Sequence, residues 1–83
     1  MNVEYYKNFI MIADYGTLTQ TSKELHIVRS ALSNQVKLLE EEYNAPLFIR
    51  KSKRLELTES GKILYSIAKQ IIRHEETAHR DID

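Results

Sequence analysis

The sequence predicts a mainly α-helical domain with three short helices, a two-stranded hairpin and a long final helix. Apolar residues recur at helical spacing in separate segments of the 83 residues. Two short strand-like runs flank a basic turn at residues 50–54. A chain of this length forms one small domain with a modest core, so a partner subunit is expected to help stabilise it.

The composition excludes several classes of protein. Cysteine is absent, which excludes a disulfide framework, a thiolate metal site and a cysteine nucleophile. No apolar run approaches the roughly 20 residues that span a bilayer, and the first residues lack a signal peptide's basic and apolar regions. We therefore expect a cytoplasmic protein without membrane contact. The net charge is zero, yet cations gather at residues 50–54 and acids at residues 40–42.

The first helix is predicted over residues 3–15 because apolar residues recur on one of its faces. These residues are Tyr6, Phe9, Ile10 and Ala13. Gly16 ends the helix as a left-handed stop. Thr17 and Gln20 then have the spacing of a capping box, in which each side chain bonds the other's backbone. A second helix follows over residues 18–25, and residues 26–28 form a tight turn.

The third helix, about residues 29–43, has two distinct faces. One face is apolar and is expected to be buried, with Leu32, Val36, Leu39 and Tyr43. The opposite face is small and polar, with Ser30, Ser33, Asn34 and Lys37. Such a stripe suits close approach to base edges, with Lys37 at phosphate, or equally an ordinary solvated surface. Asn44 ends the helix, since Pro46 forbids its continuation.

Two short strands are predicted next, at residues 47–50 and 54–57. The basic turn between them makes the hairpin a wing. Because alternate strand residues point to opposite faces, Leu47 or Phe48 is expected to anchor the core in preference to Ile49. The whole segment 1–58 then has the element order of a winged helix-turn-helix.

Thr58 is a suitable N-cap for the long final helix, about residues 59–80. Its apolar stripe is too wide for a body of this size to cover, so we expect two copies of the helix to pair as a dimer. The residues expected at that interface are Ile63, Leu64, Ile67, Ala68, Ile71 and Ile72. The alternative is a helix lying on its own domain, which would cover Ile63 and Ile67 and leave Ile71, Ile72 and Ala78 exposed.

Several motifs occur in a fixed order along the chain. They are the helix with Phe9, then Gly16-Thr17-Leu18-Thr19, Leu25-His26-Ile27, Ala31-Leu32-Ser33, Leu39-Glu40, Pro46-Leu47-Phe48-Ile49-Arg50 and Leu57-Thr58-Glu59-Ser60-Gly61. In this order and spacing the chain resembles the N-terminal DNA-binding domain of bacterial LysR-type transcriptional regulators over nearly its whole length.

The resemblance implies sequence-specific binding to double-stranded DNA, with the third helix in the major groove. It places base contacts at Arg29, Ser30, Ser33 and Asn34. It places phosphate and wing contacts at Thr19, Lys37, Arg50, Lys53 and Arg54. The linker helix, residues 59–83, would form a homodimer on a promoter inverted repeat, with half-sites about one helical turn apart.

The chain departs from the family in several respects. Val28 stands where a Ser or Thr usually caps the recognition helix, and Arg29 stands where a glutamine usually reads bases. A cation in the first turn opposes the helix dipole, and broken local rules of this kind often mark functional positions. The family's C-terminal effector-sensing domain is absent, so the chain resembles an excised DNA-binding domain, with any small-molecule effector acting only through that missing part.

No catalytic constellation or cofactor is expected. His74 and His79 are five residues apart on one helix and so do not share a face, which argues against a metal site. The runner-up function is a winged-helix module that binds another protein. Salt dependence separates the two functions, because binding to phosphates weakens steeply with ionic strength.

Overall fold

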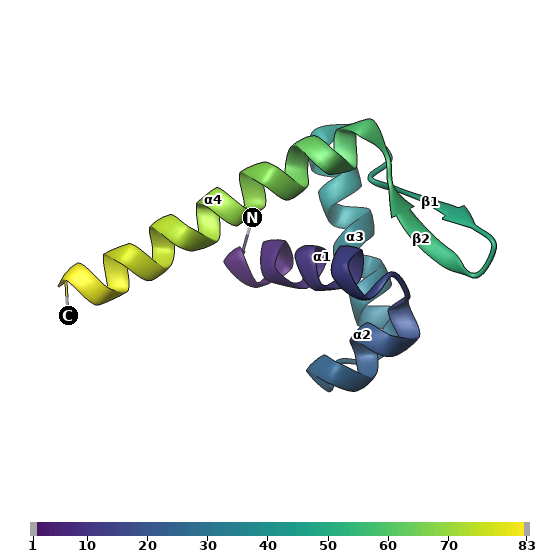
Figure 1. Cartoon of the computed structure of the whole chain (residues 1–83), viewed down its shortest axis with the longest axis horizontal. Helices are drawn as coiled ribbons and strands as arrows, with labels where there is room; N and C mark the ends of the chain where they lie inside the picture. Colours follow the sequence, from purple (N-terminus) through teal and green to yellow (C-terminus); the bar gives the residue numbers. More distant parts are fainter. Residues whose placement is uncertain (1, 83) are drawn as a thin grey trace.

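The computed structural model of the chain describes residues 2–82. Its elements are α1 (Val3–Tyr15), α2 (Leu18–Leu25), α3 (Arg29–Tyr43), β1 (Phe48–Lys51), β2 (Arg54–Leu57) and α4 (Glu59–Ile82). The predicted winged helix-turn-helix is confirmed, although the first strand is shifted by one residue and the last helix runs to Ile82. Figure 1 shows α1 crossing the middle of the body, with α4 extending beyond it and the hairpin projecting at the other end.

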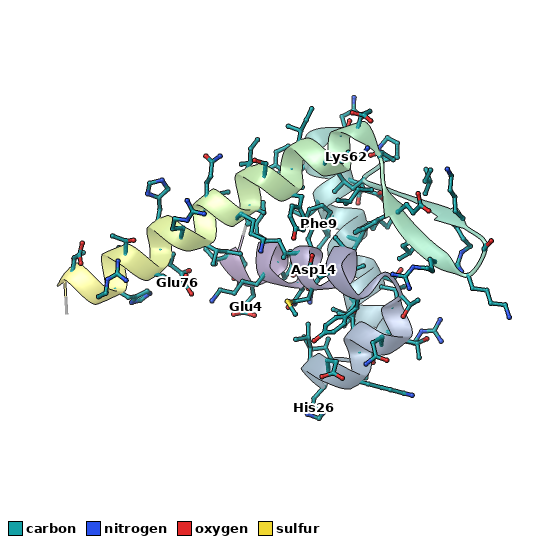
Figure 2. All side chains as sticks on the ribbon, in the orientation of Figure 1. Glu4, Phe9, Asp14, His26, Lys62 and Glu76 are labelled. Atoms are coloured by element: carbon teal, nitrogen blue, oxygen red, sulfur yellow. The ribbon has the colours of Figure 1, made fainter. Side chains whose placement is uncertain are left out.

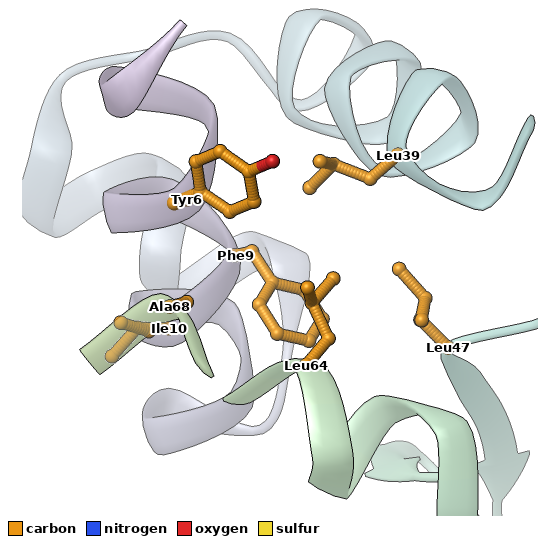
Figure 3. Close-up of a cluster of buried hydrophobic side chains, with 7 residues drawn as sticks. All are labelled: Tyr6, Phe9, Ile10, Leu39, Leu47, Leu64 and Ala68. Atoms are coloured by element: carbon orange, nitrogen blue, oxygen red, sulfur yellow. The ribbon is translucent and has the colours of Figure 1, made fainter. Parts of the chain in front are cut away.

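The hydrophobic core is built around α1. Phe9 is fully buried in the middle of a cluster contributed by α1, α3, α4 and the segment before β1 (Figure 3). Its ring lies 5.3 Å from that of Phe48, in a tilted arrangement that aromatic pairs favour. Leu47, only 1% exposed, anchors the hairpin, whereas Ile49 is 45% exposed, as strand alternation predicted.

More of α1 is buried than its apolar stripe indicates. Ile12 is fully buried and Asn8 is nearly so, although neither belongs to the predicted face. The Asn8 side-chain amide donates a hydrogen bond of 2.7 Å to the Gln35 side-chain oxygen on α3. These additional residues are buried because α1 contacts α2 and α3 as well as α4. The buried surface of α1 is therefore wider than its apolar stripe.

The turn between α2 and α3 follows local backbone chemistry. The Thr17 hydroxyl accepts a hydrogen bond from the Gln20 amide at 3.1 Å. The second half of the predicted capping box is wrong, because the Gln20 side chain donates to Glu24 instead, at 2.9 Å. His26 ends α2 in the left-handed region, with φ 56°. Val28 makes no side-chain hydrogen bond to the first turn of α3, as expected.

Tyr43 corrects the expected buried face of α3. Leu32 and Leu39 are fully buried, but Tyr43 in the last turn is 44% exposed. Its hydroxyl pairs with the hydroxyl of Tyr6 at 2.6 Å, which leaves much of its ring on the surface. Burial, and then this hydrogen bond, raise the pKa of Tyr6 well above its ordinary value.

The start of α4 is joined to the start of the hairpin. The Thr58 hydroxyl accepts a hydrogen bond from the Gly61 amide at 2.9 Å and donates one to the Pro46 carbonyl at 2.6 Å. The Thr58 amide donates to the Leu47 carbonyl at 3.0 Å. A Cβ at Gly61 would overlap that carbonyl oxygen, so only glycine permits this approach. Thr58 is thus the N-cap that the sequence predicted.

The burial of α4 differs from both sequence-based alternatives. Leu64 and Ala68 are covered by their own chain, at 4% and 0% exposure, so they are not free to form a dimer interface. Ile71 and Ile72 are half-buried against the same core. Ile63 and Ile67 remain 63% and 44% exposed. The helix lies on the body by the face containing Leu64 and Ala68, because those residues meet α1.

Polar contacts also hold α4 against α1. The Tyr65 hydroxyl donates to an Asp14 carboxylate oxygen at 2.7 Å, which raises the pKa of Tyr65. Lys7 lies 3.7 Å from Glu75, one turn beyond the core. Within residues 2–82, none of the helices is both long enough and apolar enough to cross a bilayer.

Replacing Val28 with serine is expected to stabilise the domain by about 1 kcal/mol, because serine supplies the missing N-cap. Val28 is 68% exposed, so little packing is lost. For a domain of this size the gain corresponds to a rise in melting temperature of roughly 4–8 °C. Urea and thermal denaturation followed by circular dichroism measure it. Val28→Ala is the matched control, and a serine variant no more stable than the alanine variant contradicts the prediction.

Candidate nucleic-acid interface

The polar stripe on α3 is exposed along its length. Ser30, Ser33, Asn34 and Lys37 are all solvent-exposed, and Arg29 at the start of the helix is exposed as well. The buried residues Leu32 and Leu39 fix this orientation, since they hold the opposite face of α3 against the body. Small side chains on the stripe leave the helix backbone accessible to a partner.

A groove of about 390 Å³ separates α3 from the hairpin. Ser33 and Lys37 line it from α3, and Arg50 lines it from β1. Phe48 and Leu55 form its apolar floor together with Leu18 and Val36. The stripe is therefore divided, because Ser33 and Lys37 border the groove while Ser30 and Asn34 are not among its lining residues.

A second, smaller hollow of about 150 Å³ brings three cations together. Arg29 from α3, Arg50 from β1 and Lys53 from the hairpin turn line it, beside Thr17 and Thr19 at the start of α2. The first amides of a helix lack intrahelical partners and carry the positive end of its dipole. The cationic side chains therefore lie next to the first residues of α2, an arrangement that suits a phosphate.

Thr19, Arg29, Arg50 and Lys53 were singled out from the sequence, and the structure places them around this one hollow. Arg29 lies beside the wing cations rather than apart from them. Thr17 and Leu18 also line the hollow, and sequence reasoning did not assign them a part in it. The signal that could have identified them was the N-cap at Thr17, because it places the first amides of α2 next to the turn.

Arg54 is separated from the other wing cations. It is exposed but does not line either hollow. Its guanidinium nitrogen Nη2 lies 3.5 Å from the Tyr15 carbonyl oxygen at the end of α1. Figure 2 shows other nitrogen-tipped side chains extending outward from the hairpin.

Charge is segregated along the chain, which explains how a neutral protein can have a cationic face. Glu40 is half-buried and also lines the groove beside Lys37, where its carboxylate accepts a hydrogen bond of 2.8 Å from the Leu47 amide. Glu41 and Glu42 are exposed in the last turns of α3, at the end opposite Arg29. Among residues 2–82, no three histidine or acidic side chains come close enough together to hold a metal ion.

A winged helix-turn-helix with an exposed polar helix face beside a cationic hairpin defines a class of DNA-binding regulatory proteins. Residues 4–62 match the family model described as "Bacterial regulatory helix-turn-helix protein, lysR family". The chain belongs to this family, which favours DNA binding over the alternative of a protein-interaction module.

Similar proteins agree with this family. The chain is 46% identical over 78 residues to the nitrogen assimilation regulatory protein nac of Klebsiella aerogenes, a match that covers 94% of this chain and 26% of nac. The CbnR DBD–DNA complex has a TM-score of 0.92 at 25% identity, covering 98% of this chain and 93% of that one. DarR of Vibrio fischeri in complex with DNA has a TM-score of 0.92 at 28% identity. This match covers 99% of this chain and 28% of the DarR chain. The chain therefore spans about a quarter of the length of nac and DarR.

Proposed function

We propose that residues 2–58 bind promoter DNA in the bacterial cytoplasm, with α3 in the major groove and the hairpin on the adjoining backbone or minor groove. The observation that carries this proposal is the convergence of Arg29, Arg50 and Lys53 on the start of α2, beside the exposed stripe of α3. The structures of CbnR and DarR bound to DNA support DNA as the partner.

Base recognition is assigned to the first turns of α3. The N-terminal residues of a recognition helix are those that reach base edges. Arg29, Ser30, Ser33 and Asn34 occupy these turns and are exposed. Serine and asparagine hydrogen-bond base edges, and an arginine can contact guanine through two bonds. We assign sequence preference to these four side chains.

Affinity is assigned to the surrounding cations. Lys37, Arg50 and Lys53 border the groove and the hollow, where a phosphate backbone following α3 would pass. Thr19 adds a hydroxyl and the amides of α2 add their dipole. These contacts are independent of sequence and serve to orient the protein on the duplex.

We also propose that a second copy of the chain covers the exposed side of α4. Ile63 and Ile67 line an apolar hollow of about 170 Å³ with Tyr43, Ala45 and Leu47. Both isoleucines remain exposed in the single chain. Two α4 helices that pair through Ile63 and Ile67 would cover this hollow and present two recognition helices to an inverted repeat.

Binding to a duplex selected from a random pool is expected to weaken steeply with salt. If each protomer of a dimer neutralises three or four phosphates, the slope of log affinity against log salt is about −5 to −7. Fluorescence anisotropy over a range of potassium chloride concentrations measures this slope. A slope near zero, or no selection of any duplex, contradicts the proposed function.

Arg29→Ala is expected to weaken binding to the selected duplex by roughly 1–3 kcal/mol and to relax the preference at one base position. Repeating the selection with the variant measures both effects. Lys62→Ala removes one cation from the exposed start of α4 and is the matched control, expected to keep the preference. If Arg29→Ala weakens binding equally for all duplex sequences, Arg29 contacts a phosphate and not a base. If affinity and sequence preference are both unchanged, Arg29 makes neither contact.

Ile67→Asp is expected to turn the dimer into a folded monomer, because it places a charge in the proposed interface. Sedimentation equilibrium measures the assembly state, and circular dichroism checks the fold. Ser66→Asp adds the same charge at a neighbouring exposed position of α4 and serves as the control. A wild-type chain that stays monomeric at every concentration, or an Ile67→Asp variant that dimerises normally, contradicts the proposed interface.

A further inference from the structure

The hairpin is held to the body at two places. At its base, Leu47 and Thr58 tie it to the core and to α4. Further out, the Leu55 amide donates a hydrogen bond of 2.8 Å to the Gly16 carbonyl, in the turn between α1 and α2. This second attachment is the nearer of the two to the cationic turn, so it governs where Arg50 and Lys53 lie relative to α2.

The Arg54 side chain lies over the same turn. Its guanidinium group occupies the space that a Cβ at Gly16 would fill. Gly16 has φ 81°, a conformation that already favours glycine. The Nη2 atom of Arg54 approaches the Tyr15 carbonyl at 3.5 Å. The absence of a side chain at Gly16 thus lets the guanidinium approach the backbone of this turn closely.

The electrostatics of this contact are favourable. The last carbonyls of a helix lack intrahelical partners and carry the negative end of its dipole. The last turn of α1 contains no basic residue of its own. Arg54 supplies the missing cation from a strand 39 residues further along the chain. A single side chain therefore contacts the end of α1 and links the hairpin to it.

Strand geometry separates Arg54 from the DNA-facing cations. In the antiparallel register, Arg50 pairs with Leu55 and Lys51 pairs with Arg54. Directly opposed residues share one face of a hairpin, and successive residues alternate between faces. Arg50 and Leu55 both line the groove beside α3. Arg54 is consequently on the other face, toward α1.

We infer that Arg54 is a positioning residue, which clamps the hairpin to the turn between α1 and α2 and is not itself a phosphate contact. It acts on DNA binding through Arg50 and Lys53, by holding them beside Arg29 and the start of α2. This inference rests on the proposed DNA-binding function and replaces the phosphate contact that the sequence suggested for Arg54.

Three variants of the chain test the inference: Arg54→Gln, Arg54→Lys and Lys53→Gln. Amide hydrogen exchange at Leu55 reports the attachment directly. Both Arg54 variants are expected to speed this exchange by about two- to fivefold, because each removes the guanidinium contact at the end of α1. Lys53→Gln removes a neighbouring cation and is expected to leave exchange at Leu55 unchanged.

The salt dependence of DNA binding distinguishes positioning from phosphate contact. Arg54→Gln is expected to weaken DNA binding by about two- to fivefold per protomer and to leave the slope of log affinity against log salt unchanged. Lys53→Gln is expected to lower that slope by about one per protomer. Arg54→Lys keeps the charge but not the flat guanidinium, so it is expected to behave like Arg54→Gln.

Two outcomes would overturn the inference. In the first, Arg54→Lys binds DNA like the wild type while Arg54→Gln lowers the salt slope by about one per protomer. That pattern would identify Arg54 as a phosphate contact. The other is unchanged exchange at Leu55 in both Arg54 variants. If the wild-type chain binds no duplex, the proposed function fails, while the exchange comparison still decides whether Arg54 clamps the hairpin.

Discussion

The packing of α1 against several other elements is the constraint on which the rest of the structure depends. Phe9 and Ile12 of this helix are fully buried, and α2, α3, α4 and β2 all contact it. Because each of these elements takes its position from α1, the exposed face of α3 and the cationic side of the hairpin are placed relative to each other by the core. The arrangement of the exposed α3 face beside the hairpin cations therefore depends on how α1 is packed.

Element boundaries were predictable from the sequence because they depend on local chemistry. Gly16, Asn44 and Thr58 act through their own backbone or hydroxyl groups. Burial was less predictable, because it depends on which elements meet. The sequence of α4 shows how wide its apolar stripe is, but not which half of the stripe faces the body. Leu64 and Ala68 are therefore predicted at a dimer interface from the sequence, whereas the structure places them in the core.

The candidate site shows the same division. Exposure of the polar stripe followed from the spacing of Leu32 and Leu39, and the wing followed from two short strands around a basic turn. The convergence of Arg29 with Arg50 and Lys53 required the tertiary structure, since these residues come from different elements. The separate position of Arg54 was partly readable, because it precedes the apolar Leu55 in a strand and must therefore lie on the opposite face.

The junction at Thr58, Gly61 and Leu47 makes the long helix and the hairpin one mechanical unit. Tyr65 and Glu75 extend that unit by fixing the axis of α4 against Asp14 and Lys7. In a dimer assembled through α4, the length and tilt of this helix would set the distance between the two recognition helices. The spacing of an operator's half-sites would then be encoded by residues that never touch a base.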